Sequence, residues 1–505
     1  MPDSDYFYRM KWPASPPLRL ALLVMAFTAW RSEGYHHPDE HFQILEFASY
    51  RLGHTPASDL PWEFAAQIRP GLQPFLAYCL MRVGGLLGLT DPFVQVFCLR
   101  LLSGWAFVVL VWAWGRHLAR TSGEAAAALR WAALGLWFVP YLAVRFSSEQ
   151  WGGLCFSAGA LGLLGLYAHL GDPPSRSSPS RQVWAGLGVG FLLALSFFFR
   201  YQMGFAVAGV GAWMLWRGYV SRAERLSGWC WLGLFGGAAV ASVAGFAADL
   251  WLYGEPVFAP YNYFAANILE NKAAHWGTSP WWYYAEQMVL TAVPPISLVG
   301  LLWLGRGWWQ QRSGALSWGL LAFLLAHMAV GHKEARFLYP MLLPALVLAV
   351  QGAQGFSWKK RWGRVGGLLF GLAFALNLLL LPLRCAVAAQ ESVPAFRFLY
   401  RYAAKQPVTV LSAEREVYEL VGLPVWVYRS PHVQTRVLPV LHPDSLQRAG
   451  DPSLLLFSPR LSLPAEWASV PTRRVYAYFP DWVLRFNPND WQSRARIWTF
   501  YATDP

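Results

Sequence analysis

Long apolar runs recur along most of the chain and restrict its fold more than any other feature. An α-helix needs about 20 apolar residues to cross the hydrocarbon core of a bilayer, and most of these runs have about that length. Charged residues make up 14% of the sequence, whereas ordinary soluble domains hold about 25%. The sequence therefore predicts an all-α polytopic membrane protein whose main partner is the lipid bilayer.

About eleven membrane crossings are expected from the positions of these runs. The first, at 18–30, is interpreted as a retained helix, because no small-residue cleavage site follows it. The segment 71–89 contains Gln73 and Arg82, which favours an interfacial or re-entrant helix over a crossing. The remaining crossings are expected at 93–115, 125–143, 151–170, 183–200, 203–217, 228–252, 287–304, 315–331, 337–354 and 365–384.

Basic residues set the expected orientation, because short cytoplasmic loops are enriched in Lys and Arg. The basic segments are Arg9 to Arg19, 116–120, 176–181, 217–225, 306–312 and 359–364. They form no continuous stripe, so the net charge of +13 does not indicate a nucleic-acid partner. The same orientation places 31–70, 145–150, 253–286 and 332–336 together on the outer face.

The composition changes after the last apolar run, which ends near Arg384. We therefore predict a membrane domain at 1–385 and an outer C-terminal domain at 386–505. Alternating segments at 408–411, 454–457 and 475–478 indicate short strands, so this domain is expected to be α/β or mostly β. No Asn-X-Ser/Thr sequon occurs, which favours a bacterial inner membrane with a periplasmic site over an ER membrane with a luminal site.

The segment YHHPDEHFQ, at 35–43, directly follows the first apolar run and is too polar to face lipid. Neighbouring residues of a helix point about 100° apart, so one of Asp39 and Glu40 can face a reaction while the other supports the structure. A carboxylate at the outer mouth of a helical bundle can remove a proton from a sugar hydroxyl. We expect Asp39 to be this base; the alternative is that Pro-Asp-Glu only starts a helix.

The segment GHKEARF, at 331–337, offers His332, Lys333 and Arg336 to a phosphate group at the outer face. Glu334 is expected to hold Lys333 or Arg336 in place. The alternative is a solvated loop with a surface salt bridge, but a basic segment on the outer side runs against the positive-inside trend. Arg200 and Gln202 lie at another outer turn and are further candidates for binding the donor.

A third group of polar and aromatic residues is expected to bind sugar hydroxyls and sugar faces. The alternative for its aromatic members is an interfacial belt. Weaker candidates in the same role are His37 beside Asp39, the pair Trp62 and Glu63, and the helix-end residue Glu149. The group itself comprises Asp249, Asn262, Asn267, His275, Trp276 and Trp281.

Six segments together resemble glycosyltransferase family 22, the lipid-phosphate-mannose-dependent mannosyltransferases with the GT-C fold, and are most similar to its GPI α1,2 branch. Ser279 and Trp282 depart from the family, which has His at both places. The matching segments are HPDEHFQILEFASYRLG (37–53), LPWEFAAQIRPGLQP (60–74), FRYQMGF (199–205), DLWLYGEPVFAPYNYFAANI (249–268), HWGTSPWWYYAEQ (275–287) and HKEARFLYP (332–340).

The resemblance implies transfer of mannose, with inversion, from a polyprenyl- or dolichyl-phosphate donor to a glycan or glycolipid, with Asp39 as base. A cationic clamp can stabilise the leaving phosphate, so no metal or other cofactor is expected. Transfer of another sugar from the same type of carrier, such as glucose or aminoarabinose, is the alternative. A transporter is disfavoured, because transporters place ionisable groups near the bilayer midplane and use repeats.

Overall fold

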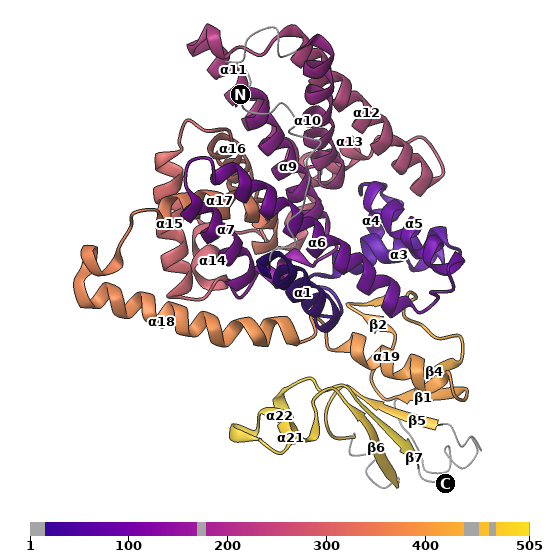
Figure 1. Ribbon diagram of the computed structural model, residues 1–505. Helices are drawn as coiled ribbons and strands as arrows, with labels where there is room; N and C mark the ends of the chain where they lie inside the picture. The colour runs from indigo at the N-terminus through magenta and orange to yellow at the C-terminus, as the bar shows by residue number, and fades with distance from the viewer. Residues whose placement is uncertain (1–15, 169–177, 439–453, 464–470, 504–505) are drawn as a thin grey trace.

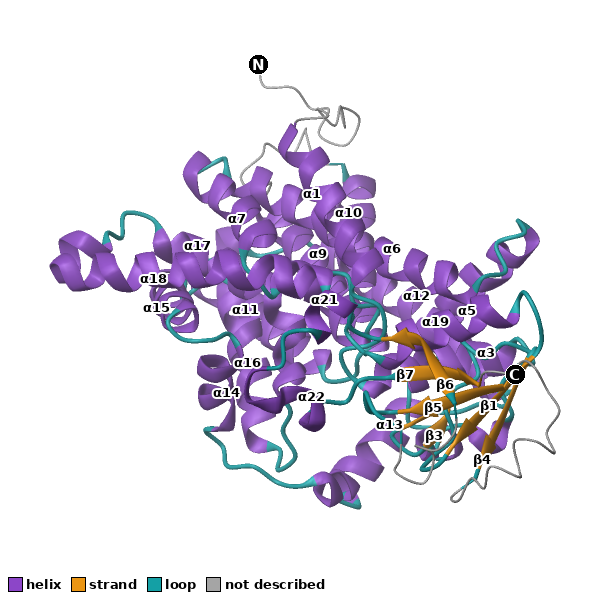
Figure 2. Ribbon diagram, turned by 90° about the horizontal axis from the view of Figure 1, so that it is seen from below, coloured by secondary structure: helices purple, strands orange, loops and turns teal. Residues whose placement is uncertain are grey.

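The structure is a computed structural model that describes residues 16–168, 178–438, 454–463 and 471–503. Arg9, Lys11 and the basic loop up to residue 177 lie outside the described residues. A helical body carries a small sheet at one end, as Figure 1 shows. Figure 2 shows the strands gathered at one side, while helix α18 (Trp358–Ala386) extends away on the other.

Several helices cross the membrane, so the chain is a multi-pass membrane protein. Within the described ranges, six helices are long and apolar enough to span a bilayer. The count of eleven crossings stays a prediction. The six are α6 (Pro92–Leu118), α9 (Ser148–Ala168), α10 (Pro179–Phe199), α12 (Gly228–Tyr253), the segment Ala335–Ala353, and Lys360–Ala386 within α18.

Shorter helices lie where the other crossings are expected, and among those of 10–17 residues in the described ranges α16 (Ala315–Ala329) is the apolar one. The segment Ala335–Ala353 is divided into a 3-10 turn and a helix. The full set is α1 (Pro16–Arg31), α7 (Gly123–Gly135), α8 (Val139–Ala143), α11 (Met203–Val220), α14 (Tyr283–Thr291), α15 (Ile296–Gln310), α16 (Ala315–Ala329), η6 (Ala335–Met341) and α17 (Leu342–Ala353).

Two expected crossings are wrong as continuous helices. The segment 125–143 is broken into α7 and α8, and 287–304 is broken into α14 and α15. Proline explains both breaks, since it lacks an N–H donor and disfavours helical geometry in the residue before it. Pro140 lies in the first turn of α8, and Pro294 and Pro295 separate α14 from α15.

Helices α10 and α12 pack closely along their glycines. A Cβ atom at Gly190 would lie 2.0 Å from the Leu234 carbonyl oxygen, and one at Gly237 would lie 2.0 Å from that of Leu187. Small residues allow such backbone contact, which replaces the hydrophobic driving force that lipid cannot provide. This pair forms a fixed wall beside the loops described below.

The loop that follows α1, residues 32–71 and called the first loop here, holds short helices instead of a membrane span. The next helix, α5 (Leu72–Leu86), has 15 residues, fewer than the roughly 20 that a span needs. The short elements of the first loop are α2 (Pro38–Glu40), the π-helix η1 (His41–Leu45), α3 (Glu46–Arg51), η2 (Ala57–Asp59) and α4 (Trp62–Ala65).

The C-terminal region is a mixed five-stranded sheet in the order β4-β1-β5-β7-β6, covered by α19 (Ser392–Ala403). The predicted sheet region is confirmed, and each expected strand overlaps an observed one. Strand β1 pairs in parallel with β4 and β5, and β7 pairs antiparallel with β5 and β6. The strands are β1 (Val408–Ser412), β4 (Val433–Val437), β5 (Leu454–Ser458), β6 (Thr472–Ala477) and β7 (Thr499–Thr503), with the hairpin β2 (Glu419–Leu420) and β3 (Leu423–Pro424) beside them.

The first loop and the C-terminal region share one hydrophobic core. Phe42 and Leu45 of η1 belong to the same buried cluster as Phe396 of α19 and Val410 of β1. Burying about 150–250 Å² of each aromatic ring makes such a contact strong. The sheet therefore supports the loop that carries the predicted base; the division of the chain at residue 385 stays a prediction.

The other short elements lie in the connections between the larger ones. They are η3 (Arg222–Glu224), α13 (Ala259–Phe264), the π-helix η4 (Ala265–Leu269), η5 (Lys272–Trp276), α21 (Asp481–Leu484), η8 (Pro488–Asp490) and α22 (Trp491–Arg494).

Candidate active site

Asp39 lies in the first turn of α2, where the sequence predicts a helix start. Pro38 occupies the first helical position, which suits a residue with no N–H, and His37 is the N-cap. The His37 Nδ1 atom lies 3.3 Å from the backbone nitrogen of Asp39. Because His37 caps the helix, the Asp39 carboxylate is left for other contacts.

Asp39 forms an ion pair with two arginines from distant parts of the chain. Its Oδ2 atom lies 2.9 Å from an Arg336 nitrogen and 3.8 Å from Nη2 of Arg69. Burial alone would raise the pKa of Asp39, but Arg336, His37 and Arg69 together outweigh burial and hold that pKa well below its usual range. The side chain is 24% exposed, so Asp39 is an ionised carboxylate that a substrate can reach.

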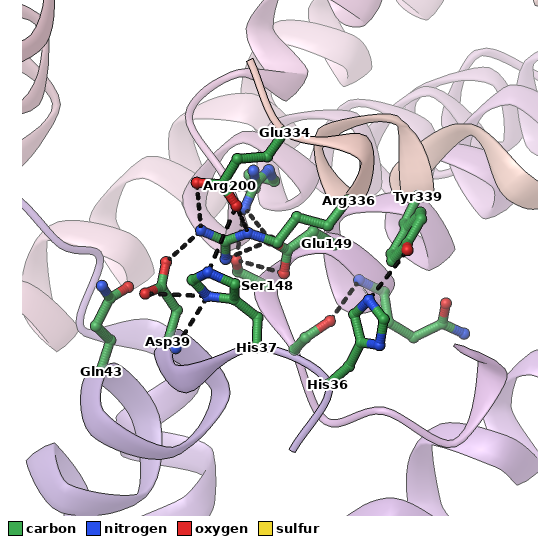
Figure 3. Close-up of polar contacts among 12 residues, drawn as sticks. His36, His37, Asp39, Gln43, Ser148, Glu149, Arg200, Glu334, Arg336 and Tyr339 are labelled. Carbon is green, nitrogen blue, oxygen red and sulfur yellow. Dashed lines mark hydrogen bonds and ion pairs between the residues drawn. The ribbon is translucent and has the colours of Figure 1, made fainter. Parts of the chain in front are cut away.

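Arg336 is the centre of a charge network in Figure 3. Besides Asp39, its guanidinium donates to Glu334 at 2.6 Å and to Glu149 at 3.2 Å. Arg200 donates to the same Glu149 oxygen at 2.8 Å. Burial alone would raise the pKa of Glu334, yet the hydrogen bond and positive charge of Arg336, with a hydrogen bond from His332, together lower it to about 2. Charge-assisted bonds of this kind fix the positions of the groups around Asp39.

The Asp39 cavity, an opening of about 490 Å³, lies between the first loop, the start of α9 and the turn between α10 and α11. It is lined by Asp39, Glu40, Gln43, Ile44, Arg69, Pro70, Gln73, Pro74, Ser147, Ser148, Glu149, Phe199, Arg200, Tyr201, Gln202 and Tyr263. Its polar walls and its base suit a hydroxylated ligand.

Glu40 lines this cavity and two smaller ones of about 280 and 320 Å³. Burial raises the pKa of Glu40 to about 7. The 280 Å³ cavity is also lined by Arg336, Arg145 and Tyr339. Adjacent carboxyls thus meet different surroundings, because Asp39 contacts cations while Glu40 lies in the wall between cavities.

The donor-binding residues predicted at 332–336 have separate positions. Both ring nitrogens of His332 face acceptors, the Glu334 carboxylate at 3.0 Å and the Gly277 carbonyl at 3.0 Å, to which a ring N–H donates. The ammonium group of Lys333 donates to backbone carbonyls, including that of Ser279 at 2.9 Å. Glu334 therefore holds Arg336 and His332, so of its two expected partners, Lys333 and Arg336, it contacts Arg336. Glu334, the residue directly before η6, has an extended backbone. Successive side chains of an extended segment point to opposite sides, so Lys333 points away from Asp39.

Three amide side chains, the donor candidate Gln202 and the sugar-binding candidates Asn262 and Asn267, lie at or near the cavity. Gln202 donates to the Tyr263 hydroxyl at 2.5 Å, and both line the cavity. Asn262 donates to the Gln67 carbonyl at 3.3 Å, and Asn267 to the Tyr263 carbonyl at 2.9 Å. The Asn262 bond joins the segment 259–269 to the first loop, whereas the Asn267 bond stays within that segment.

Two acidic candidates support the cavity from behind. Glu63 accepts from Arg69 at 3.3 Å and from Gln43 at 3.0 Å, and both donors line the cavity. Asp249 of α12 is buried and accepts from the backbone nitrogen of Gly71 at 2.7 Å. Their contacts are those of residues that position the first loop.

The aromatic candidates lie apart from the charge network. Trp276 and Trp281 are 70% and 63% exposed, and His275 is exposed as well. Trp62 is exposed, with the Lys272 ammonium 5.8 Å from its ring centre. An exposed aromatic position fits the alternative of an interfacial belt, and a role in binding sugar stays a prediction.

Sequence reasoning missed several residues of the site. Arg69 forms an ion pair with Asp39, and His36 contacts the hydroxyls of Tyr339 at 3.0 Å and Tyr141 at 3.2 Å. Gln73 and Tyr201 line the Asp39 cavity. All four lie in segments singled out above: His36 in 35–43, Arg69 and Gln73 in 60–74, and Tyr201 in 199–205. The segments gave no sign of the contacts that bring these side chains together.

The sequence profile of the Alg9-like mannosyltransferase family matches residues 18–423. The chain is 29% identical over 354 residues to GPI mannosyltransferase 3 of Yarrowia lipolytica, covering 66% of this chain and 61% of that protein. It is 26% identical over 349 residues to mannosyltransferase APTG1 of Arabidopsis thaliana, covering 66% and 58%. GPI alpha-1,2-mannosyltransferase 4 of Homo sapiens is 27% identical over 405 residues, covering 70% and 67%. The chain spans less than two thirds of the first two proteins' length.

Among solved structures, the chain is similar to ArnT from Cupriavidus metallidurans bound to undecaprenyl phosphate. The TM-score is 0.55 at 12% identity, and the match covers 96% of this chain and 97% of that one. At this identity the likeness shows the fold, and it confirms the expected GT-C architecture. The curated relatives named above are a yeast, a plant and a human protein, so they do not support a bacterial membrane, which stays a prediction.

Proposed function

Because the chain belongs to the Alg9-like mannosyltransferase family, we propose that it transfers mannose from a polyprenyl- or dolichyl-phosphate donor to a glycan or glycolipid. The observation that carries this proposal is the ionised Asp39 carboxylate at a polar cavity, held by Arg336 at 2.9 Å. A carboxylate that stays ionised and accessible is suited to accept a proton.

In the proposed reaction, an acceptor hydroxyl in the Asp39 cavity attacks the anomeric carbon of the donor sugar. Asp39 takes the proton of that hydroxyl as the new bond forms. The bond between the anomeric carbon and the phosphate oxygen breaks on the opposite face, so the configuration inverts. The lipid phosphate leaves with the electron pair of that bond.

The cations that line the cavity support the departure of the phosphate. Nε of Arg69 and Nε of Arg200 are buried and lack a hydrogen-bond partner within the described part of the chain, and both residues line the cavity. Fixed donors stabilise developing negative charge without reorganising at the moment of reaction. The sequence predicted Arg200 as a cation that stabilises the leaving phosphate. We assign the same role to Arg69 in place of Lys333. We propose that the phosphate leaves without the help of a metal ion.

The test is transfer of radiolabelled mannose from polyprenyl-phosphate-mannose to a lipid extract by the purified protein in detergent. Asp39→Asn keeps the side-chain shape and removes the base, so we expect activity to fall by about 100-fold or more. Asp59→Asn, in the same loop but bonded to Trp426 at 2.9 Å, is the matched control and should retain activity. Equal activity of Asp39→Asn and the wild type would refute the role of Asp39. Transfer of a different carrier-linked sugar, but not of mannose, would refute the donor.

A further inference from the structure

The Asp39 cavity has in its wall a buried amide that bonds to none of the described residues. Gln73 is 1% exposed, and neither its Nε2 nor its Oε1 atom has a partner among the residues described. It lines the same cavity as Asp39. Buried polar groups in proteins are almost always hydrogen-bonded, and leaving one unpaired destabilises the fold. An unpaired amide in a cavity wall therefore marks a place where a ligand supplies the missing partner.

The position of Gln73 is fixed by the packing of α5 against α12. The backbone nitrogen of Gly71 donates to Asp249 at 2.7 Å. A Cβ atom at Gly71 would lie 2.3 Å from the Ala248 carbonyl oxygen, so the start of α5 meets the backbone of α12 directly. The amide cannot find a new partner by a small shift of its helix, because that helix is held at its first turn. The backbone that carries Gln73 is thus held in one place in the cavity wall.

A second unpaired group lines the same cavity. Tyr201 is 7% exposed, and its hydroxyl has no partner in the described ranges. The amide of Gln73 offers two donors and one acceptor, and the Tyr201 hydroxyl offers both functions. Neither group is charged, whereas the cavity cations are Arg69 and Arg200. Uncharged groups that both donate and accept match neighbouring hydroxyls better than they match a phosphate.

We propose that Gln73 and Tyr201 form a subsite that binds the hydroxyls of a hexose in the Asp39 cavity. The inference rests on the proposed function and deepens it, because it assigns the recognition of the sugar ring to side chains outside the charge network. The hexose is either the donor's sugar or the sugar of the acceptor that Asp39 activates. The two sugars offer the same hydroxyl groups to the subsite. The KM values for donor and acceptor show which of the two it binds.

The test variant is Gln73→Leu, which keeps most of the side-chain volume and removes both polar atoms. Without substrate, its midpoint of thermal unfolding should equal or exceed that of the wild type, because no bond is lost and an unpaired buried amide is removed. Its KM should rise about 10-fold for one substrate, the loss expected when a ligand hydroxyl bonds to nothing. Tyr201→Phe should raise the same KM by a smaller factor.

Gln95→Leu is the matched control. The Gln95 amide donates to the Leu89 carbonyl at 2.7 Å, so its loss should lower the unfolding midpoint and leave both KM values unchanged. A higher donor KM in Gln73→Leu assigns the subsite to the donor sugar, and a higher acceptor KM assigns it to the acceptor. Unchanged KM values for both, or a lowered unfolding midpoint with unchanged KM, would overturn the proposal.

A binding measurement separates this inference from the proposed function. Methyl α-mannoside at millimolar concentration should raise the unfolding midpoint of the wild type more than that of Gln73→Leu. If the wild type transfers no mannose, the proposed function fails, and a selective loss of this protection in Gln73→Leu would still support the subsite. Equal protection of the two proteins would count against it.

Discussion

The first loop contains two carboxylate–histidine pairs a few residues apart, and their surroundings differ. The Asp39 carboxylate lies 3.3 Å from a ring nitrogen of His37, and Glu46 lies 2.8 Å from that of His41. The Asp39 side chain is 24% exposed and lines a cavity, whereas that of Glu46 is 1% exposed. The pairs have the same chemistry, and only one of them is open to a substrate.

The contacts of Glu46 are those of a structural group. Its Oε1 atom accepts from the backbone nitrogens of Trp426 and Val427 at 2.9 and 3.2 Å, and its Oε2 accepts from Thr55 at 2.8 Å. These bonds join the first loop to the C-terminal region. A buried carboxylate with its acceptor sites filled is stable but cannot accept a proton from a substrate. Access, not the presence of a histidine partner, therefore distinguishes the candidate base.

The largest expected effect on stability is at the buried pair of Glu46 and His41. Glu46→Leu removes the acceptor of the His41 ring and of two backbone N–H groups, and leaves the Thr55 hydroxyl with Ser49 alone. We expect the free energy of unfolding to fall by about 3–5 kcal/mol, as when one partner of a buried charged pair is removed. The measurement is thermal unfolding in detergent, with the exposed Glu414→Leu as control. An unchanged midpoint would contradict the structural role of Glu46.

The pair that is open to a substrate, Asp39 and His37, depends on Arg336. Arg336 contacts three carboxylates, those of Asp39, Glu149 and Glu334. Lysine keeps the charge but cannot donate to all three at once, so Arg336→Lys should lose about 1.5–3 kcal/mol of interaction, or about 10- to 100-fold in kcat/KM. Arg336→Gln removes the charge that lowers the pKa of Asp39, so that pKa should rise. Because Asp39 must be ionised to act, the acidic limb of the pH–rate profile should move to higher pH.

An acidic limb that stays in place in Arg336→Gln would show that the titration of Asp39 does not control the rate. Arg336→Lys provides the comparison, because it retains a positive charge and should shift the limb less than Arg336→Gln does.

The smallest expected effect is at Glu40, between the cavities. Burial raises its pKa from 4.5 to about 7, so between these pH values the folded state binds more protons than the unfolded state. Stability from this group is therefore lost as the pH rises from about 4.5 to 7. Glu40→Gln does not lose this stability. The difference between its unfolding midpoint and that of the wild type should therefore grow by a few degrees as the pH rises from about 4.5 to 7. A difference that is independent of pH would contradict this assignment.

Much of the site was predictable because its motifs are local. The helix start at Pro38, the positions of Asp39 and Arg336, and the strands around 408–411 and 454–457 follow from short patterns, and the family that the motifs resemble is confirmed by the profile match. The place of Lys333 was not predictable, since a single step along an extended segment reverses the direction of a side chain. Gln73 and Tyr201 lie within the quoted segments 60–74 and 199–205, but nothing local shows that they share a cavity. Only the packing of α5 against α12 and α10 brings them together.

The sequence by itself determined that this chain is a helical membrane protein of a mannosyltransferase family. Long apolar runs leave no alternative, because a bilayer core offers no water to bond the backbone and each segment must form its bonds internally as a helix. The tertiary structure alone decided which of the carboxylates near residue 40 is accessible. That outcome depends on contacts between residues far apart in sequence, such as Arg336 with Asp39 and Trp426 with Glu46, and no local pattern encodes such contacts.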